Sequence, residues 1–175
     1  MKYRSHWLLP GVFTMLLACM LVTYGCKVNY SFTGASISPD VRTISIPVIS
    51  NNAPLVVPTL SHTLTDAVRD YFTSQTNLVM VDRNGDLSVE GTITGYDIQP
   101  VAIQGNEKAA MNRLTITISV KFTNRKDQKQ NFENSFSRYE DYLSTQSLAS
   151  VQDGLIKDIT DQLVQDIFNK SVANW

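Results

Sequence analysis

The chain of 175 residues has few of the side chains that carry enzyme chemistry: two histidines, His6 and His62, and two cysteines, Cys19 and Cys26. This scarcity leaves no histidine–cysteine cluster in the sequence that could bind zinc. The sequence also lacks a phosphate-binding loop, a dinucleotide-binding glycine motif and the nucleophile elbow of serine hydrolases. We therefore expect no enzyme activity, no metal site and no cofactor.

A strong charge of either sign is also missing. The formal net charge is −1 and only 18% of residues are charged, so no basic field exists to attract nucleic acid. The sequence therefore predicts no nucleic-acid partner. The hydrophobic fraction of 43% is that of a folded chain, and the length is enough for one domain with a core.

The N-terminal segment differs from the rest of the chain. Lys2 and Arg4 provide a basic start, the run from Trp7 to Val22 carries no charge, and the first acidic residue is Asp40. A basic start followed by an apolar run of this length predicts an export signal over residues 1–25. An uncleaved membrane anchor is the alternative. Without residues 1–25 the chain carries 13 basic and 16 acidic residues, a net charge of −3.

Cys26 directly follows the predicted signal and is the single cysteine of the chain after it. A lone cysteine in an oxidising compartment has no internal partner for a disulfide, and lipidation accounts for its position. The small residue Gly25 before it agrees with a lipoprotein cleavage site, although Thr23 departs from the usual leucine. Cys19, preceded by Leu16, fits the local pattern better but would leave an apolar stub. We predict a covalent lipid on Cys26 and a tether over residues 26–40.

The remainder, residues 41–175, shows the alternation of strands and helices expected for one domain. Period-two alternation predicts strands over residues 41–48, 87–98, 114–122 and 132–139, and a short apolar run covers residues 78–81. Apolar residues at helical spacing predict helices over residues 58–74 and 147–170. The fold class is therefore α+β, a two-layer sandwich with two helices on one face of a mostly antiparallel or mixed sheet of four to five strands.

Several local features add detail to this fold. Asn84-Gly85 predicts a turn, and Gly91 and Gly95 mark bulges or bends in the strand that contains them. Ser150 with Asp153 resembles a capping box, which would start the second helix there. Acidic neighbours such as Glu140 and Asp141 would face opposite sides of a strand, which excludes a catalytic pair of carboxylates.

Charge is concentrated in the predicted hairpin between residues 108 and 132. That segment has six basic residues and one acidic residue, whereas the chain from residue 139 to residue 170 is mainly acidic. A solvated turn would explain the hairpin charge. The functional alternative is a site for an anionic surface such as phosphorylated lipid. The candidate anion-binding residues are Lys121, Arg125, Lys126, Lys129 and Arg113.

An ordered series of segments resembles the lipopolysaccharide-assembly lipoprotein family LptE. The series begins at Cys26 and continues with the residues that follow it as far as Ile37. The later matching segments are Thr43–Pro47, Asn51–Ala53, Leu64–Ala67, Gly91–Tyr96, Leu114–Ile116 and Phe136–Tyr139. The resemblance covers essentially the whole chain after the predicted signal, and its weight comes from the order of the segments.

The resemblance implies a location and partners. Members of this family are lipoproteins anchored to the periplasmic side of the outer membrane. They plug an LptD-type β-barrel translocon, help it to assemble and help to deliver lipopolysaccharide to the cell surface. The implied fold, a sheet with two helices on one face, agrees with the fold expected from periodicity. A lipoprotein accessory subunit of another periplasmic transport or secretion complex is the alternative.

Overall fold

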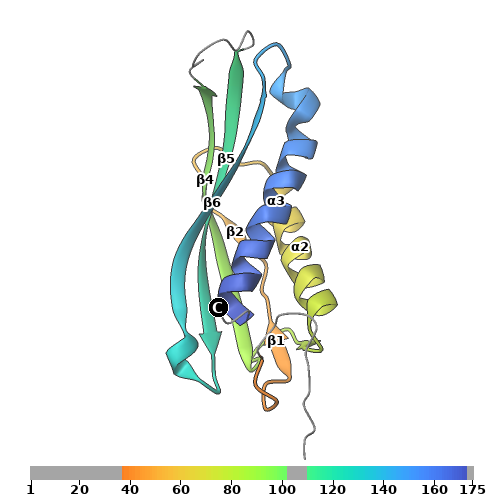
Figure 1. The fold of residues 1–175 in the computed structure, drawn as a ribbon, viewed down its shortest axis with the longest axis vertical. Helices are drawn as coiled ribbons and strands as arrows, with labels where there is room; N and C mark the ends of the chain where they lie inside the picture. The colour runs from red at the N-terminus through yellow and green to blue at the C-terminus, as the bar shows by residue number, and fades with distance from the viewer. Residues whose placement is uncertain (1–36, 102–109, 173–175) are drawn as a thin grey trace, which may run out of the picture. The chain divides into compact units, whose positions relative to one another are not determined.

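The structure of the protein is a computed structural model that describes residues 37–101 and 110–172. The predicted signal, Cys19, Cys26 and the tether as far as residue 36 lie outside the described residues. Figure 1 shows one layer of strands and one layer of two helices, α2 and α3, side by side. The helical elements are α2 (Leu60–Gln75), η2 (Gln128–Gln130) and α3 (Leu148–Val172). The strands are β1 (Thr43–Ser45), β2 (Ser50–Asn51), β3 (Val79–Met80), β4 (Leu87–Val101), β5 (Met111–Asn124) and β6 (Phe132–Leu143).

The six strands form one mixed sheet in the order β3-β1-β4-β5-β6, with β2 also paired to β4. β1 and β2 run parallel to β4, and β1 runs parallel to β3. The β4–β5 and β5–β6 pairs are antiparallel. The predicted two-layer α+β fold is confirmed, and the sheet has six strands instead of four to five. β2 and β3 are only two residues long, too short to give a periodic signal.

The alternation along β5 divides its side chains between the two faces of the sheet. Leu114, Ile116, Ile118, Val120 and Phe122 are all buried beneath the helices. The residues between them face the other side, because successive side chains of a strand point to opposite faces. One face of the sheet therefore belongs to the core, as its sequence predicts.

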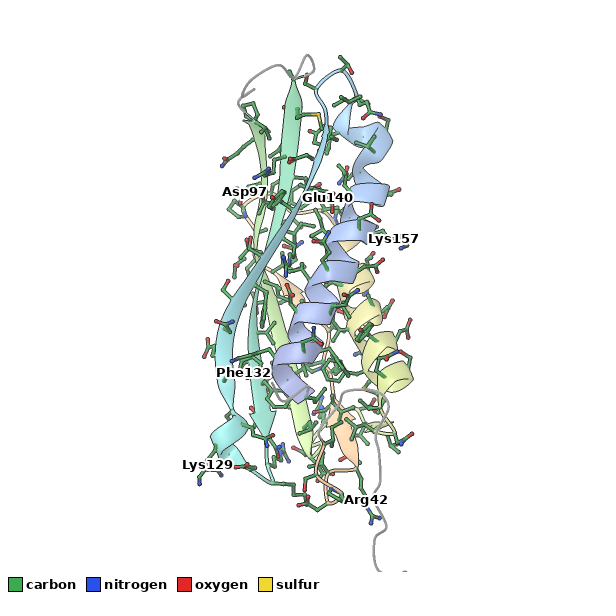
Figure 2. All side chains as sticks on the ribbon, viewed as in Figure 1. Arg42, Asp97, Lys129, Phe132, Glu140 and Lys157 are labelled. Carbon is green, nitrogen blue, oxygen red and sulfur yellow. The ribbon has the colours of Figure 1, made fainter. Side chains whose placement is uncertain are left out.

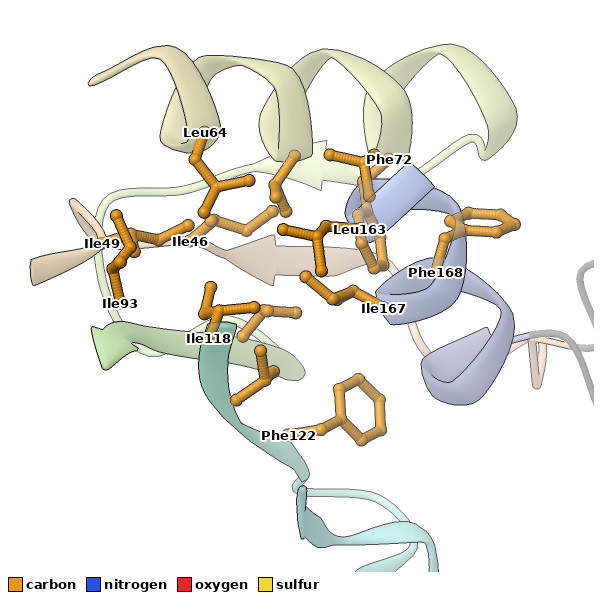
Figure 3. Packing of buried hydrophobic residues seen from close by; sticks show 14 of the residues in the cluster. Ile46, Ile49, Leu64, Phe72, Ile93, Ile118, Phe122, Leu163, Ile167 and Phe168 are labelled. Atoms are coloured by element: carbon orange, nitrogen blue, oxygen red, sulfur yellow. The ribbon is translucent and has the colours of Figure 1, made fainter. Parts of the chain in front are cut away.

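The two helices close the core above that face (Figure 3). Leu64, Val68 and Phe72 of α2 are fully buried, and so are Leu163 and Ile167 of α3. Phe168 of α3 packs edge-on against the rings of Tyr71 and Phe72 at centroid distances of 5.1 Å. Such edge-to-face contacts between aromatic rings are favourable beyond the area that they bury.

The beginning of α3 differs from the prediction. The helix starts at Leu148, and Ser150 lies inside its first turn, where its hydroxyl donates to the carbonyl of Ser147 at 2.7 Å. A capping serine must accept from a later backbone N–H, so the predicted capping box of Ser150 and Asp153 is wrong. A hydroxyl inside a helix can bond back to the preceding turn instead.

Other local predictions are confirmed. Asn84 has a positive φ of 59°, which places a turn at Asn84-Gly85 between β3 and β4. β4 changes register against β5 between Ile93 and Gly95, so Thr94 is an extra residue and forms a bulge. The strand predicted over residues 41–48 is shorter in the structure: β1 ends at Ser45, and Pro47, which has no N–H to donate to a sheet, lies outside both β1 and β2.

Candidate functional site

The face of the β4–β5–β6 sheet opposite the helices is open within the described residues and is covered with hydroxyl groups. Thr117 on β5 and Ser137 on β6 share a hydrogen bond of 3.0 Å across the sheet. Ser50 on β2 and Thr92 on β4 share another of 2.9 Å. Further hydroxyls on this face come from Thr115, Ser119, Thr123 and Ser135. The open face is therefore polar and almost uncharged along its middle.

A charged cluster lies at the end of this face where β5 begins. Arg113 forms a two-pronged salt bridge with Asp141 on β6, with distances of 2.8 and 2.9 Å. The same guanidinium lies over the ring of Tyr139, 3.6 Å from its centroid. The hydrogen bonds from Arg113 lower the pKa of Asp141. Because Asp141 and Tyr139 already hold the guanidinium, Arg113 is less available to a ligand than a free cation would be.

The other four candidate cations lie around the opposite end of β5, at the turn into β6. Lys121 is on the open face, Arg125 and Lys126 follow β5, and Lys129 is in η2. Figure 2 shows Lys129 and Arg42 at this end of the domain. Arg113 and Lys121 are eight positions apart on β5, roughly 27 Å at about 3.4 Å per residue. The structure therefore groups four of the five candidates and leaves Arg113 apart.

Two of these cations are held by neighbouring side chains. Lys126 pairs with Asp86 at 3.3 Å, and Arg125 donates to the side-chain oxygen of Asn84 at 2.9 Å. Lys121 lies in a shallow hollow of the open face together with Glu90 and Glu133, its neighbours in the strand register. Within the described part of the chain, Lys129 makes no salt bridge. Lys129 is therefore the candidate most available to an anion.

Asp86 joins the hairpin turn to β1, and the sequence analysis did not single it out. Its carboxylate accepts hydrogen bonds from the backbone N–H of Arg42 at 2.9 Å and of Thr43 at 3.0 Å. The hydroxyl of Thr43 donates a third bond of 2.9 Å. These donors hold the pKa of Asp86 well below its usual range, with the N–H of Arg42 the largest cause. The position of Asp86 after Asn84-Gly85 gave little indication that it would bind the backbone of β1, because acidic residues are common in turns for local reasons.

The remaining polar predictions concern chemistry. Glu140 accepts from Gln162 of α3 at 2.6 Å, whereas Asp141 bonds to Arg113 on the opposite face, so these neighbours do face opposite sides. His62 is exposed on α2. Residues 37–101 and 110–172 contain no group of three metal-binding side chains. In those same ranges no helix has both the length and the hydrophobicity to cross a bilayer.

Comparison with protein families decides the family of this fold. The sequence model of LptE, described as lipopolysaccharide-assembly, matches residues 41–171. The chain belongs to the LptE family. This membership assigns it a role in lipopolysaccharide assembly and confirms the resemblance found in the sequence. Comparison with curated proteins gives no match.

The solved structures to which the chain is similar include several lipoproteins. A minor lipoprotein from Acinetobacter baumannii has a TM-score of 0.48 and 15% identity to this LptE-family chain. The similarity covers 74% of this chain and 91% of the Acinetobacter chain. Rare lipoprotein B from Shewanella oneidensis has a TM-score of 0.46 and 16% identity over 73% and 92% of the two chains. An uncharacterized lipoprotein B from Nitrosomonas europaea has a TM-score of 0.48 and 14% identity over 82% and 88%.

Proposed function

We propose that this LptE-family protein is an outer-membrane lipoprotein that plugs an LptD-type β-barrel translocon. In that position it helps the barrel to assemble and aids delivery of lipopolysaccharide to the cell surface. The family match over residues 41–171 carries the proposal. The role is one of binding and positioning, without enzyme activity.

The open face of the sheet supports a position inside a barrel. The lumen of a large outer-membrane barrel is polar, whereas its outer surface is apolar. A face rich in serine and threonine can exchange hydrogen bonds with such a wall without burying unpaired charge. The two helices, which cover the other face of the sheet, would then face away from that part of the wall.

The length of the domain is also suitable. β5 has 14 residues and α3 has 25, which correspond to roughly 48 Å and about 38 Å at the usual rise per residue. A bilayer with its headgroup regions is about 40–45 Å thick. The domain is therefore long enough to occupy the lumen from one side of the membrane to the other.

Purification of the native complex tests the plug. The full chain, carrying an affinity tag at its C-terminus, is isolated from its own membrane in a mild detergent, and the bound proteins are identified. We expect a large outer-membrane β-barrel in stoichiometric amount. Recovery of an ABC-type or secretion-pore partner without any barrel would refute the plug. It would favour the alternative, an accessory subunit of another periplasmic transport or secretion complex.

The anchor rests on Cys26, and Cys19 is its competitor. We propose that residues 1–25 are removed and that a lipid on Cys26 holds the protein on the periplasmic side of the outer membrane. Mass spectrometry of the N-terminus of the isolated protein tests this assignment. An acylated chain starting at Cys26 is expected. A chain starting at Lys27, or an unmodified Cys26, would overturn the anchor.

The cations of the hairpin turn are the proposed contact with the phosphates of lipopolysaccharide. Replacement of Lys121, Arg125, Lys126 and Lys129 by glutamine should weaken lipopolysaccharide binding, and the loss should be largest at low salt because exposed charges are screened. Lys157→Gln is the matched control, since this exposed lysine of α3 pairs with Asp161. Equal binding by the quadruple variant and the control at low salt would show that the hairpin turn is only solvated and does not bind lipopolysaccharide.

A further inference from the structure

β6 forms a long edge of the sheet and contains no proline and no β-bulge that would protect it. It pairs with β5 over all twelve of its residues, from Phe132 to Leu143, without a register shift. Its sequence contains neither proline nor glycine. Within the described residues no strand pairs with its outer side. Alternate backbone N–H and C=O groups of β6 therefore point away from the sheet and can accept another strand.

The other long edge of the sheet is protected. This edge is the part of β4 that follows Ile93. β4 pairs with β2 at Thr92 and Ile93, and from there to Val101 no strand of the described residues pairs with the side of β4 away from β5. It contains the bulge at Thr94 and a proline, Pro100, both of which oppose strand addition. The two edges therefore differ in their capacity to pair with a further strand.

Charged side chains often protect an edge, but most of those on β6 are held by neighbours. Arg138 forms a two-pronged salt bridge with Asp166 of α3 at 2.6 and 2.7 Å. Glu140 bonds to Gln162 of α3, and Asp141 bonds to Arg113 of β5. Glu133 is the one charged residue of β6 without a side-chain bond to another part of the described chain. It would lie beside an added strand on the open face.

The position of α3 argues against a second copy of this chain as the added strand. α3 follows β6 along its length. Lys170 lies over the ring of Phe132, Asp166 pairs with Arg138, and Gln162 bonds to Glu140. Two copies joined through β6 would bring both α3 helices to the same side of the joined sheet. Their spacing would be about two strand widths, roughly 10 Å, which is helix-contact distance. The flanks that meet there would each carry the Arg138–Asp166 salt bridge, and burying these charged groups against each other would cost desolvation energy without giving either charge a new partner.

We propose that β6 binds one extended segment of a partner protein by strand addition. Successive side chains of this partner segment would face opposite sides of the sheet. Those on the helix side would be aliphatic, because they lie beside the half-buried rings of Phe132 and Phe136. Those on the open face would carry hydroxyls beside Ser135 and Ser137, with a lysine or arginine opposite Glu133. This proposal rests on the edge alone and does not require a barrel partner.

A synthetic peptide with the sequence of β5, Leu114–Phe122, has this chemistry and is a direct probe. It alternates aliphatic residues with hydroxyls and ends with the lysine and phenylalanine that face Glu133 and Phe132 in the native sheet. The labelled peptide is titrated into the full chain in detergent. Two further versions of the peptide carry N-methyl groups on every second backbone amide. One version is methylated on one alternating set of amides, and the other version on the other set. One version should lose binding by about tenfold or more, and the other should retain it, because only one set of amides faces β6.

Hydrogen exchange locates the bound peptide and a charge exchange tests its register. Amides of β6 should become protected on binding, and amides of β4 should not change. Glu133→Lys should weaken binding by about twofold to fivefold, and a peptide with glutamate in place of its lysine should recover it. Asp153→Lys, at an exposed position of α3, is the matched control and should leave binding unchanged.

Three results would overturn the proposal. Equal binding by both N-methylated peptides would indicate adsorption without strand pairing. Unchanged exchange of the β6 amides would place the peptide elsewhere. A dimer of the full chain in sedimentation measurements, abolished by a strand-breaking change in β6, would assign the edge to a second copy. The proposed plug is tested separately, because loss of strand addition would leave copurification with a barrel unaffected.

Discussion

Two glycines offer a prediction in which the same substitution has opposite effects. Gly85 lies in the turn between β3 and β4, where β1 passes close to it. A Cβ atom there would lie 2.6 Å from the carbonyl oxygen of Leu87 and 2.6 Å from the backbone nitrogen of Ser45. Both atoms belong to the backbone and cannot move aside as a flexible side chain would. Gly154 lies in α3, and a Cβ atom there would have no neighbour within 4 Å.

The magnitudes follow from these surroundings. Relief at Gly85→Ala requires β1 to separate from β4 at the pair of Ser45 with Ser88, so the loss belongs at the upper end of overpacking effects, about 3 kcal/mol. Gly154→Ala removes backbone freedom from the unfolded chain and adds a better helix former. Its gain should be about 0.5–1 kcal/mol. The two sites have no neighbouring atom in common, so the double variant should show the sum of both effects.

Urea unfolding of the full chain in a fixed detergent measures both effects. The unfolding midpoint should fall for Gly85→Ala and rise for Gly154→Ala, with no change in the slope of free energy against urea concentration. In thermal unfolding each 1 kcal/mol should correspond to a shift of about 2–4 °C. A loss below about 1 kcal/mol for Gly85→Ala would show that the turn relaxes without separating the strands. A loss at Gly154→Ala would contradict the open surroundings of that position.

Two further predictions concern the core and the turn. Leu163→Ala removes a fully buried side chain between the helices and the sheet and should cost about 2–5 kcal/mol, measured as the change in urea midpoint. Asp86→Asn should reduce stability at neutral pH. The folded-state pKa of Asp86 is below its ordinary value of 3.8, so its contribution is present above that value and is lost as pH falls through the lower folded-state pKa. The stability difference between wild type and variant should therefore shrink below about pH 4, and a difference that stays constant down to acid unfolding would contradict the role of the carboxylate.

The sequence by itself was sufficient to determine which residues of each element face the core. The alternation from Leu114 to Phe122 predicts one buried face, and every second residue of β5 is buried there. The helical spacing from Leu60 to Phe72 predicts the buried stripe of α2 in the same way. Both patterns are local, because the geometry of one strand or one helix alone sets their period. The family resemblance was also accessible, since it depends on the order of segments along the chain.

Only the tertiary structure decided which elements meet. Parallel pairing of β1 and β2 with β4 joins short segments about 40 residues apart, and no local pattern encodes such a register. The same is true of charge. The sequence offers five candidate cations that it cannot tell apart. In the structure Arg113 pairs with Asp141 and Lys126 pairs with Asp86, whereas Lys129 is exposed at the turn. A charge gains or loses its availability through neighbours that folding brings from elsewhere in the chain, so its role depends on the fold.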